Sequence, residues 1–407
     1  NFKAMVHKIH MGSGLTKAGY NYAAILFNNV TYTQDITNCR KCHDTAMGAQ
    51  GDNWQTKPSR KACGACHDNI NWATGANLKA GGAPHVASPD DSACASCHAA
   101  TSPYAPGKVH MTINATPHNP TVADGLANFT YDINSVTVDG TNQAVIKFRI
   151  MKYVSPALPA TATAVTFDGS GANPLSGFTG GPSFLLAYNL SATNQPFTAS
   201  PDYNNVGVKA AQPISVSIAN LLDGTKGTLV AGTGADAGYY IATIKGDKAP
   251  PTSGAYSFPV GAKMRAVALQ GYFTQVSPAA ARHAVAVQKP VTHATDVTLN
   301  DTVRRTAIDP AKCGNCHEWF EGHGGNRVYT VQVCVMCHVP NLSSSGRGAN
   351  AATVATDMAS TSPDLVADGY TLLDPTTYPE DSENFKELIH GIHAGSEVIG
   401  TGAPLQI

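Results

Sequence analysis

The feature that most constrains this chain is a short pattern, Cys-x-x-Cys-His, which occurs five times in 407 residues. The five copies use all ten cysteines of the chain and leave none over. Each copy places two thiols a short turn apart and follows them at once with an imidazole. The copies are Cys39–His43, Cys63–His67, Cys94–His98, Cys313–His317 and Cys334–His338.

This pattern is the attachment signature of c-type haem. Two thiols at this spacing reach the two vinyl groups on one edge of a porphyrin, and the next histidine then lies under the iron as an axial ligand. A zinc ribbon needs two cysteine pairs per metal, so five pairs do not partition, and a thioredoxin-like pair would occur once beside a βαβ pattern. We therefore predict five haem c groups. Their attachment residues are Cys39, Cys42, Cys63, Cys66, Cys94, Cys97, Cys313, Cys316, Cys334 and Cys337, and their proximal ligands are His43, His67, His98, His317 and His338.

Ten further histidines remain, and five irons need at most five of them as second ligands. An iron held by two histidines is saturated and suits electron transfer, whereas an open sixth position suits substrate chemistry. The supply of histidine therefore favours a conductor over an enzyme. The predicted distal ligands are His7, His10, His85, His110, His323, His390 and His393, while His118, His283 and His293 are expected to be ordinary surface or core histidines.

A second repeat stands near the two ends of the chain. The sequence Asn-Phe-Lys-x-x-x-His-x-x-His-x-Gly occurs at residues 1–12 and again at 384–395. Apolar residues between the histidines predict a short helix, on which positions three apart share a face and can reach two neighbouring haems. The order of motifs suggests that each end holds half of a module. Either the chain is excised from a longer one, or the tail of one copy completes the head of the next in a head-to-tail filament.

The middle of the chain has no cysteine and reads as antiparallel β structure. Asp139-Gly140 between two alternating runs predicts a hairpin, and Gly/Pro/Asn turns separate the other runs. The predicted strands are Phe129–Val136, Ala144–Ile150, Ser183–Leu190, Ile214–Ile218, Tyr239–Ile244, Tyr256–Val260 and Met264–Phe273. We favour a spacer that holds haems in register over a binding module for this region.

The expected fold is a multihaem cytochrome c with little regular secondary structure in the haem regions and a central antiparallel β-sandwich or split barrel. Residues 1–118 form a half-module with three haems, 119–300 the β-domain, and 301–407 a half-module with two haems and the second Asn-Phe-Lys motif. Residues 341–383 read as a surface loop.

Composition narrows the partners and the compartment. The net charge is −1, so the charge does not favour binding to nucleic acid. The sequence has no run of 18 or more apolar residues, so we expect no transmembrane segment. The first residue is Asn1 rather than methionine, so we expect a mature or excised segment. Haem is attached to cysteines outside the cytoplasm, which predicts the periplasm or beyond.

Taken together, the residues resemble the OmcA/MtrC family of extracellular multihaem cytochromes. The resemblance rests on both Asn-Phe-Lys motifs, on His323-Gly324-Gly325-x-Arg327 after a haem motif, and on the run from Cys63 to Thr74. It implies pentahaem modules with stacked bis-histidine haems, split-barrel β-domains, and a place at the outer-membrane surface or outside the cell. The β-domains of the family often carry a cysteine pair that this chain lacks, and its members usually hold ten haems.

These observations favour an electron conduit that is not an enzyme, with extracellular acceptors such as minerals and metal ions. Its partners would be other multihaem cytochromes or copies of itself end to end, as a filament or as part of a decahaem chain. The alternative is a catalytic pentahaem reductase resembling nitrite reductases. Such enzymes typically replace one proximal histidine by lysine, whereas all five sites here have histidine.

Overall fold

The computed structural model describes residues 2–190, 202–205, 212–245, 256–293, 300–340 and 383–394. The chain divides into two compact units. The first comprises Asn1–Asn128, Tyr153–Ala162 and Ala311–Phe320, and the second comprises Phe129–Lys152, Thr163–Pro310 and Glu321–Ile407. The fourth haem motif therefore belongs to the first unit, and the fifth belongs to the second. The stretch 341–382, expected to be a surface loop, lies outside the described residues.

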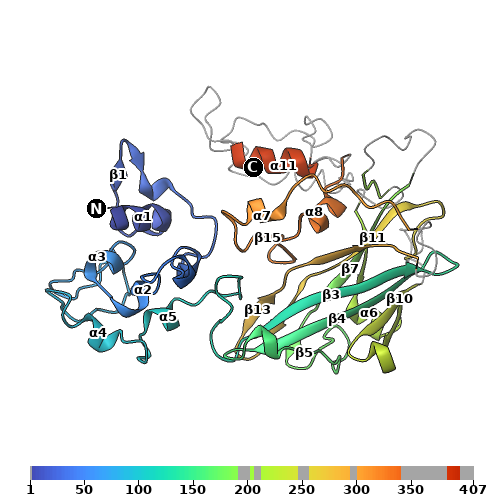
Figure 1. Cartoon of the computed structure of the whole chain (residues 1–407), viewed down its shortest axis with the longest axis horizontal. Coiled ribbons are helices and arrows are strands. Elements are labelled where there is room, and N and C mark those ends of the chain that lie inside the picture. The colour runs from blue at the N-terminus through green and yellow to red at the C-terminus, as the bar shows by residue number, and fades with distance from the viewer. Residues whose placement is uncertain are drawn as a thin grey trace, which may run out of the picture. The chain divides into compact units, whose positions relative to one another are not determined.

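The first unit consists of short helices joined by turns (Figure 1). Its longest helix ends where Gly12 adopts a φ of 48°, a left-handed conformation that favours glycine. A side chain at Gly12 would also lie 2.0 Å from the Val30 carbonyl oxygen. Its α-helices are α1 (Phe2–Met11), α2 (Asn53–Thr56), α3 (Arg60–Cys63), α4 (Cys94–Cys97), α5 (Pro106–Val109) and α7 (Pro310–Cys313); its 3-10 turns are η1 (Gly12–Gly14), η2 (Phe27–Asn29), η3 (Cys39–Lys41), η4 (Thr45–Met47) and η5 (Pro159–Thr161).

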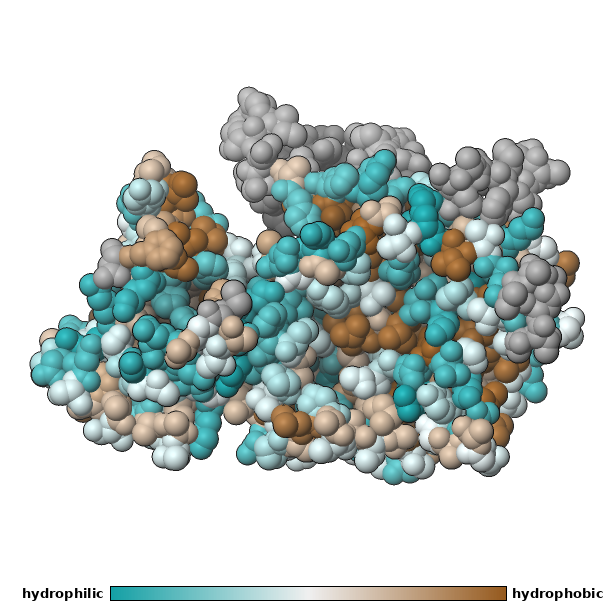
Figure 2. All heavy atoms as spheres, in the orientation of Figure 1, coloured by the Kyte–Doolittle hydropathy of each residue, from teal (hydrophilic) through white to brown (hydrophobic). Residues whose placement is uncertain are grey.

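A small hairpin in the first unit exposes apolar side chains. Strands β1 (Asn21–Tyr22) and β2 (Ile25–Leu26) pair antiparallel. Tyr22, Ile25 and Leu26 are all exposed to solvent. Figure 2 shows this part of the unit as a group of brown spheres.

The second unit is built from antiparallel sheets, as predicted. The largest has the strand order β3 (Ala127–Val138), β4 (Ala144–Val154), β10 (Tyr240–Ile244), β9 (Gly227–Ala231), with β5 (Thr163–Ala164) paired to β4. The next has the order β14 (Val287–Pro290), β11 (Lys263–Gln270), β7 (Ser183–Asn189), β8 (Ile214–Ser217). Two smaller sheets are β13 (Ala280–His283), β12 (Tyr272–Gln275), β6 (Phe178–Thr179), and the hairpin β15 (Glu321–Gly322), β16 (Arg327–Val328).

The predicted hairpin at Asp139-Gly140 is confirmed as the connection between β3 and β4. Its left-handed residue is Asn142, with a φ of 61°, rather than Gly140. The prediction of a strand at Tyr256–Val260 is wrong, because these residues form bends and turns. Pro259 has no amide hydrogen to donate to the hydrogen-bond ladder of a sheet. The side chain of Phe258 is buried in the core and is 1% exposed.

The two Asn-Phe-Lys motifs both form the predicted helices, α1 and α11 (Phe385–Ala394). Their first aromatic residues differ in environment: Phe2 is 77% exposed, whereas Phe385 is 8% exposed. Phe385 belongs to a core cluster that also includes Met264 of β11 and Met336 of α8 (Val331–Cys337). Figure 1 shows α8 and α11 beside this part of the sheet. Among the described residues of the second unit, the other helical segments are α6 (Ile218–Leu222) and the turn η7 (Gly234–Asp236).

Candidate haem-binding sites

All five Cys-x-x-Cys-His motifs share one local conformation. In each, the amide of the histidine donates to the carbonyl of the first cysteine, which closes one helical turn. Cysteines three residues apart then lie on the same face of the turn, and the histidine follows directly above the first of them. None of the ten cysteines forms a disulfide. The closing N···O distances are 2.9 Å for His43, 2.8 Å for His67, 3.0 Å for His98, 2.8 Å for His317 and 3.0 Å for His338.

Four of the motif histidines lie opposite a histidine that the sequence predicts as a distal ligand. Two imidazoles on opposite sides of one metal ion, each bonded through nitrogen at about 2 Å, have ring centroids roughly 6 Å apart. The observed separations agree with this value. They are 5.9 Å for His7 and His43, 5.9 Å for His67 and His110, 6.2 Å for His85 and His98, and 6.0 Å for His323 and His338.

Hydrogen bonds orient several of these rings. In six histidines Nδ1 lies within hydrogen-bond distance of a backbone carbonyl oxygen, which can only accept, so Nδ1 carries the proton. The other ring nitrogen, Nε2, then has a free lone pair for a metal. The Nδ1···O distances are 2.8 Å for His10 to Val6, 2.6 Å for His85 to Val86, 2.8 Å for His98 to Tyr104, 2.9 Å for His110 to Pro106, 2.9 Å for His338 to Glu383 and 2.7 Å for His393 to Ile389.

The histidines of the first unit also crowd one another. Burial lowers the pKa of His67 below its ordinary value, and the nearby positive charges of His110, His85 and His98 lower it further. The pKa of His7 is lowered in the same way, first by burial and then by His43, His10 and Lys3. A lowered pKa keeps an imidazole neutral and able to bind metal. Because His85 and His98 of the third pair act on His67 of the second motif, the second and third motifs lie next to each other.

The first and fourth motifs are also neighbours, within the first unit. The Lys41 ammonium donates to the Gly314 carbonyl at 2.9 Å, and the Gln34 side-chain amide donates to the Cys316 carbonyl at 2.8 Å. Burial, and after it the nearby Cys66, raise the pKa of the Cys39 thiol to about 11. The pKa of Tyr32 is raised by burial and then by Cys42 and other acidic groups, including Glu318, Cys316 and Cys39. Cysteines from the first, second and fourth motifs therefore lie near Cys39 or Tyr32.

Sequence reasoning missed Glu318, which follows the fourth motif directly. It is buried, 4% exposed, and receives a hydrogen bond from the amide of His118 at 2.9 Å. Burial would raise its pKa, but hydrogen bonds from Thr116 and the His118 amide, together with the charge of His118, lower it overall. Nδ1 of His118 lies 2.9 Å from the carboxylate. In the sequence, the one sign of this contact is that Glu318 directly follows the predicted ligand His317. Nothing in the sequence connects Glu318 with His118.

Trp54 and Trp72, which lie between the first three motifs in the sequence, both lie beside predicted ligands. Trp54 is 6.4 Å from His43 and Trp72 is 5.1 Å from His85, measured between ring centroids. Among the described residues, Trp54 Nε1 and His7 Nδ1 are buried side-chain atoms without a hydrogen-bond partner. Such donors fit a site that receives a polar cofactor edge, for example a haem propionate, so the residues present fit a haem group.

The other predicted ligands are placed as follows. His10 contacts Tyr32 edge-on with ring centroids 4.8 Å apart, and His317 contacts Phe320 edge-on at 5.6 Å. His390 and His393 lie on the exposed part of α11. Within the described ranges, no group of three or more His, Cys, Asp or Glu side chains converges as a compact metal cluster would require.

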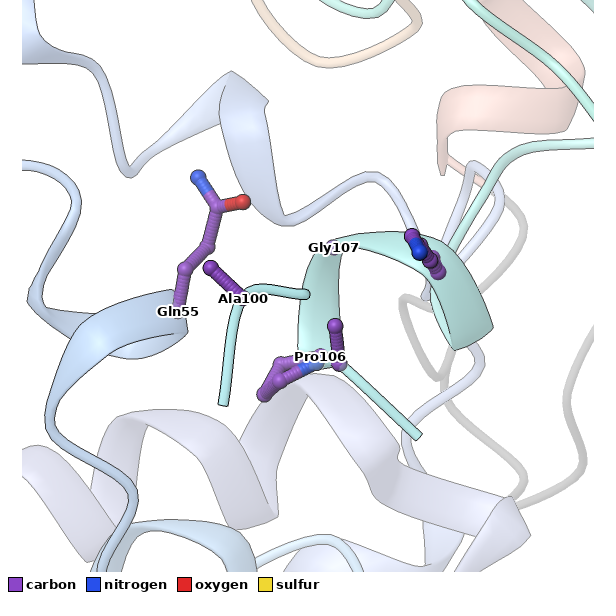
Figure 3. Close-up of a pocket in the computed structure, with 6 residues that line it drawn as sticks. Gln55, Ala100, Pro106 and Gly107 are labelled. Carbon is purple, nitrogen blue, oxygen red and sulfur yellow. The ribbon is translucent and has the colours of Figure 1, made fainter. Parts of the chain in front are cut away.

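A shallow pocket lies between α2 and α5 in the first unit (Figure 3). It is lined by Gln55, Ala100, Ala105, Pro106, Gly107 and Lys108, and its volume is about 160 Å³. Small-molecule sites are typically about 300–1,000 Å³. This pocket is therefore smaller than a typical small-molecule site.

Comparison with known proteins identifies the N-terminal part of the chain. Residues 1–111 match the family described as outer membrane cytochrome MtrC/MtrF-like, domains II/IV. This segment is similar to the MtrC/MtrF-like cytochrome domains. The MtrC/MtrF-like segment contains the first Asn-Phe-Lys motif, three haem motifs and three of the four imidazole pairs. No curated protein matches the chain.

The match confirms the resemblance found from the sequence, for the part of the chain that it covers. It also confirms the expected outer-membrane association at the level of the family, which is one of outer membrane cytochromes. None of the helices in the described ranges has the length and apolar character needed to cross a membrane.

Proposed function

We propose that the chain is a multihaem c-type cytochrome that carries electrons along five bis-histidine haems toward extracellular acceptors. The observation that carries this proposal is the set of four imidazole pairs, each with ring centroids 5.9–6.2 Å apart. For the fourth motif we propose a second ligand from α1, the Asn-Phe-Lys helix of the same unit. A bound haem supplies a reversible one-electron change at iron.

The residues of the chain hold and tune these sites. Carbonyl groups that accept from Nδ1 fix each ring and increase its basicity as a ligand. Contacts between motifs, such as Lys41 with Gly314, keep neighbouring sites in a fixed relation. With both axial positions taken by imidazole, no substrate reaches the iron, so the residues favour conduction over catalysis. This opposes the alternative of a pentahaem reductase.

We also propose the finer organisation predicted above. Two haem half-modules, 1–118 and 301–407, flank a β-domain at 119–300, whose antiparallel sheets are compatible with a sandwich or split barrel. Other multihaem cytochromes, or copies of the chain end to end, would continue the path of electrons. The exposed Phe2, set against the buried Phe385 of the equivalent helix, supports a partner at the first Asn-Phe-Lys helix.

The test uses the protein as it is secreted, with its haems attached. Mass spectrometry should find five covalent haems, and the reduced wild type should bind no carbon monoxide. Replacing a predicted distal ligand, in His110→Ala or His85→Ala, should open one iron in five to carbon monoxide. The matched control is His293→Ala, which should leave all irons closed.

Two results would contradict the proposal. Strong carbon monoxide binding by the wild type would reveal an open iron and favour the reductase. Full occupancy of the sixth position in both His110→Ala and His85→Ala would show that the imidazole pairs are not ligand pairs.

A further inference from the structure

The loop that carries His323 has an unusual backbone. It connects β15 to β16, and its residues His323, Gly324 and Gly325 have φ values of 55°, 64° and 85°. Such left-handed conformations are unfavourable for a residue other than glycine, so His323 must be held there by its surroundings. Asn326 supplies part of this support, because its Nδ2 and its amide donate to the His323 carbonyl at 3.0 and 3.4 Å.

The sheets of the same unit supply the rest. The imidazole of His283, at the end of β13, lies against Gly325 so closely that a Cβ there would be 2.1–2.4 Å from three ring atoms. Nδ1 of His283 lies 2.7 Å from Oε2 of Glu321, at the start of the loop. The amide of Gly271 donates to the Asn326 carbonyl at 2.8 Å. The loop is therefore fixed at both of its sides.

The second imidazole of this pair is fixed by the same unit. His338 follows α8, whose Val333, Val335 and Met336 lie in the core cluster with β7 and β11. His323 and His338 face each other with ring centroids 6.0 Å apart and planes 29° apart. The separation of the two rings thus depends on where the β-sheets hold each segment.

We propose that His283 is a positioning residue for the fifth haem motif, which clamps the Gly324-Gly325 turn so that His323 reaches the iron bound by His338. This inference rests on the proposed function, in which His323 and His338 ligate one haem. It gives a role to His283, which the sequence alone predicts to be an ordinary surface or core histidine. It also makes the β-domain part of a haem site rather than only a spacer. Gly325 has no side chain because the imidazole of His283 takes that space.

The first experiment replaces His283 with alanine in the haem-loaded protein. We expect carbon monoxide to bind one iron in five after reduction, and one low-spin bis-histidine signal to change in electron paramagnetic resonance. His283→Asn, which keeps a donor toward Glu321, should restore part of the wild-type signal. His293→Ala, the same change elsewhere in the unit, should behave as wild type.

The second experiment uses the contact itself. Gly325→Ala should open the same iron, because its methyl group meets the imidazole of His283. In free energy of unfolding, the double variant His283→Ala, Gly325→Ala should lose less than the sum of the two single variants, because the methyl group then has room. Additive losses would overturn the proposed contact.

Three outcomes separate this inference from the proposed function. A wild type with an open iron would refute the proposed function itself. Closed irons and unchanged resonance in His283→Ala, with a bis-histidine wild type, would refute only the positioning role. Loss of the β-sheet circular dichroism signal in both His283 variants would also refute it, because His283 would then be a general structural residue.

Discussion

A single buried side chain, that of Asn205, joins the sheet to the helix of the fifth haem motif. Asn205 is 0% exposed and has a φ of 44°. Its Oδ1 accepts from the Tyr188 amide in β7 at 3.1 Å, and its Nδ2 donates to the Met336 carbonyl in the last turn of α8 at 2.9 Å. A carbonyl in that turn has no partner within its own helix. Asn205 therefore satisfies one backbone group on each element.

We predict that Asn205→Ala lowers the free energy of unfolding of the second unit by about 3–7 kcal/mol. A buried backbone group left without a hydrogen-bond partner costs about 1–3 kcal/mol. The substitution leaves two such groups, the Tyr188 amide and the Met336 carbonyl. Alanine in a left-handed conformation adds about 1 kcal/mol. Asn205→Gly removes the same hydrogen bonds without that strain, so it should be about 1 kcal/mol less damaging than alanine.

The assay is guanidinium unfolding of the haem-loaded protein, followed by the β-sheet signal in far-ultraviolet circular dichroism. The matched control is Asn142→Ala in the β3–β4 loop, where φ is also positive at 61°, and it should cost about 1 kcal/mol. If Asn205→Ala and Asn142→Ala destabilise the protein equally, the bridging hydrogen bonds contribute nothing measurable and the reasoning is refuted.

Three further predictions concern stability, two of them in the second unit and one in the first. Asp301→Ala should cost about 3–5 kcal/mol in the same assay, because it strands the guanidinium of Arg265, whose side chain is 11% exposed and lies 2.7 Å from Asp301. Asp91→Ala, which breaks the exposed pair with Arg60, should leave stability almost unchanged, and an equal loss would contradict this. Burial raises the pKa of Tyr131 above its ordinary value of about 10, so its contribution to stability is complete below pH about 10 and falls as pH rises toward the folded-state pKa. Tyr131→Phe should flatten that alkaline decline in unfolding measurements, and an unchanged slope would count against it.

The repeated Cys-x-x-Cys-His motif carries most of what can be predicted about the sites. Its geometry is local, since the histidine amide and the first cysteine carbonyl are four residues apart, and all five copies adopt the same turn. The helices of the Asn-Phe-Lys motifs and the β3–β4 hairpin are local in the same sense. Antiparallel structure follows from alternating residues and turn residues. Tyr256–Val260 failed because Pro259 overrides its β-branched and aromatic neighbours.

Pairing of imidazoles is not local. His67 faces His110, and His7 faces His43, although the intervening chain has few regular elements. Counting histidines gave a group of candidate ligands, but only the fold brought a particular two together. The same holds for Phe2 and Phe385, which occupy equivalent positions of one repeated motif and differ in burial.

The sequence alone predicts the chemistry of this protein, because ten thiols and five adjacent imidazoles stand in the pattern that is typical of haem attachment. The tertiary structure decided which histidines face each other, placed the fourth motif in one compact unit and the fifth in the other, and set His283 against Gly325. The physical reason is range. Attachment depends on residues within one turn, whereas the position of a second ligand depends on packing between segments that only the folded chain brings into contact.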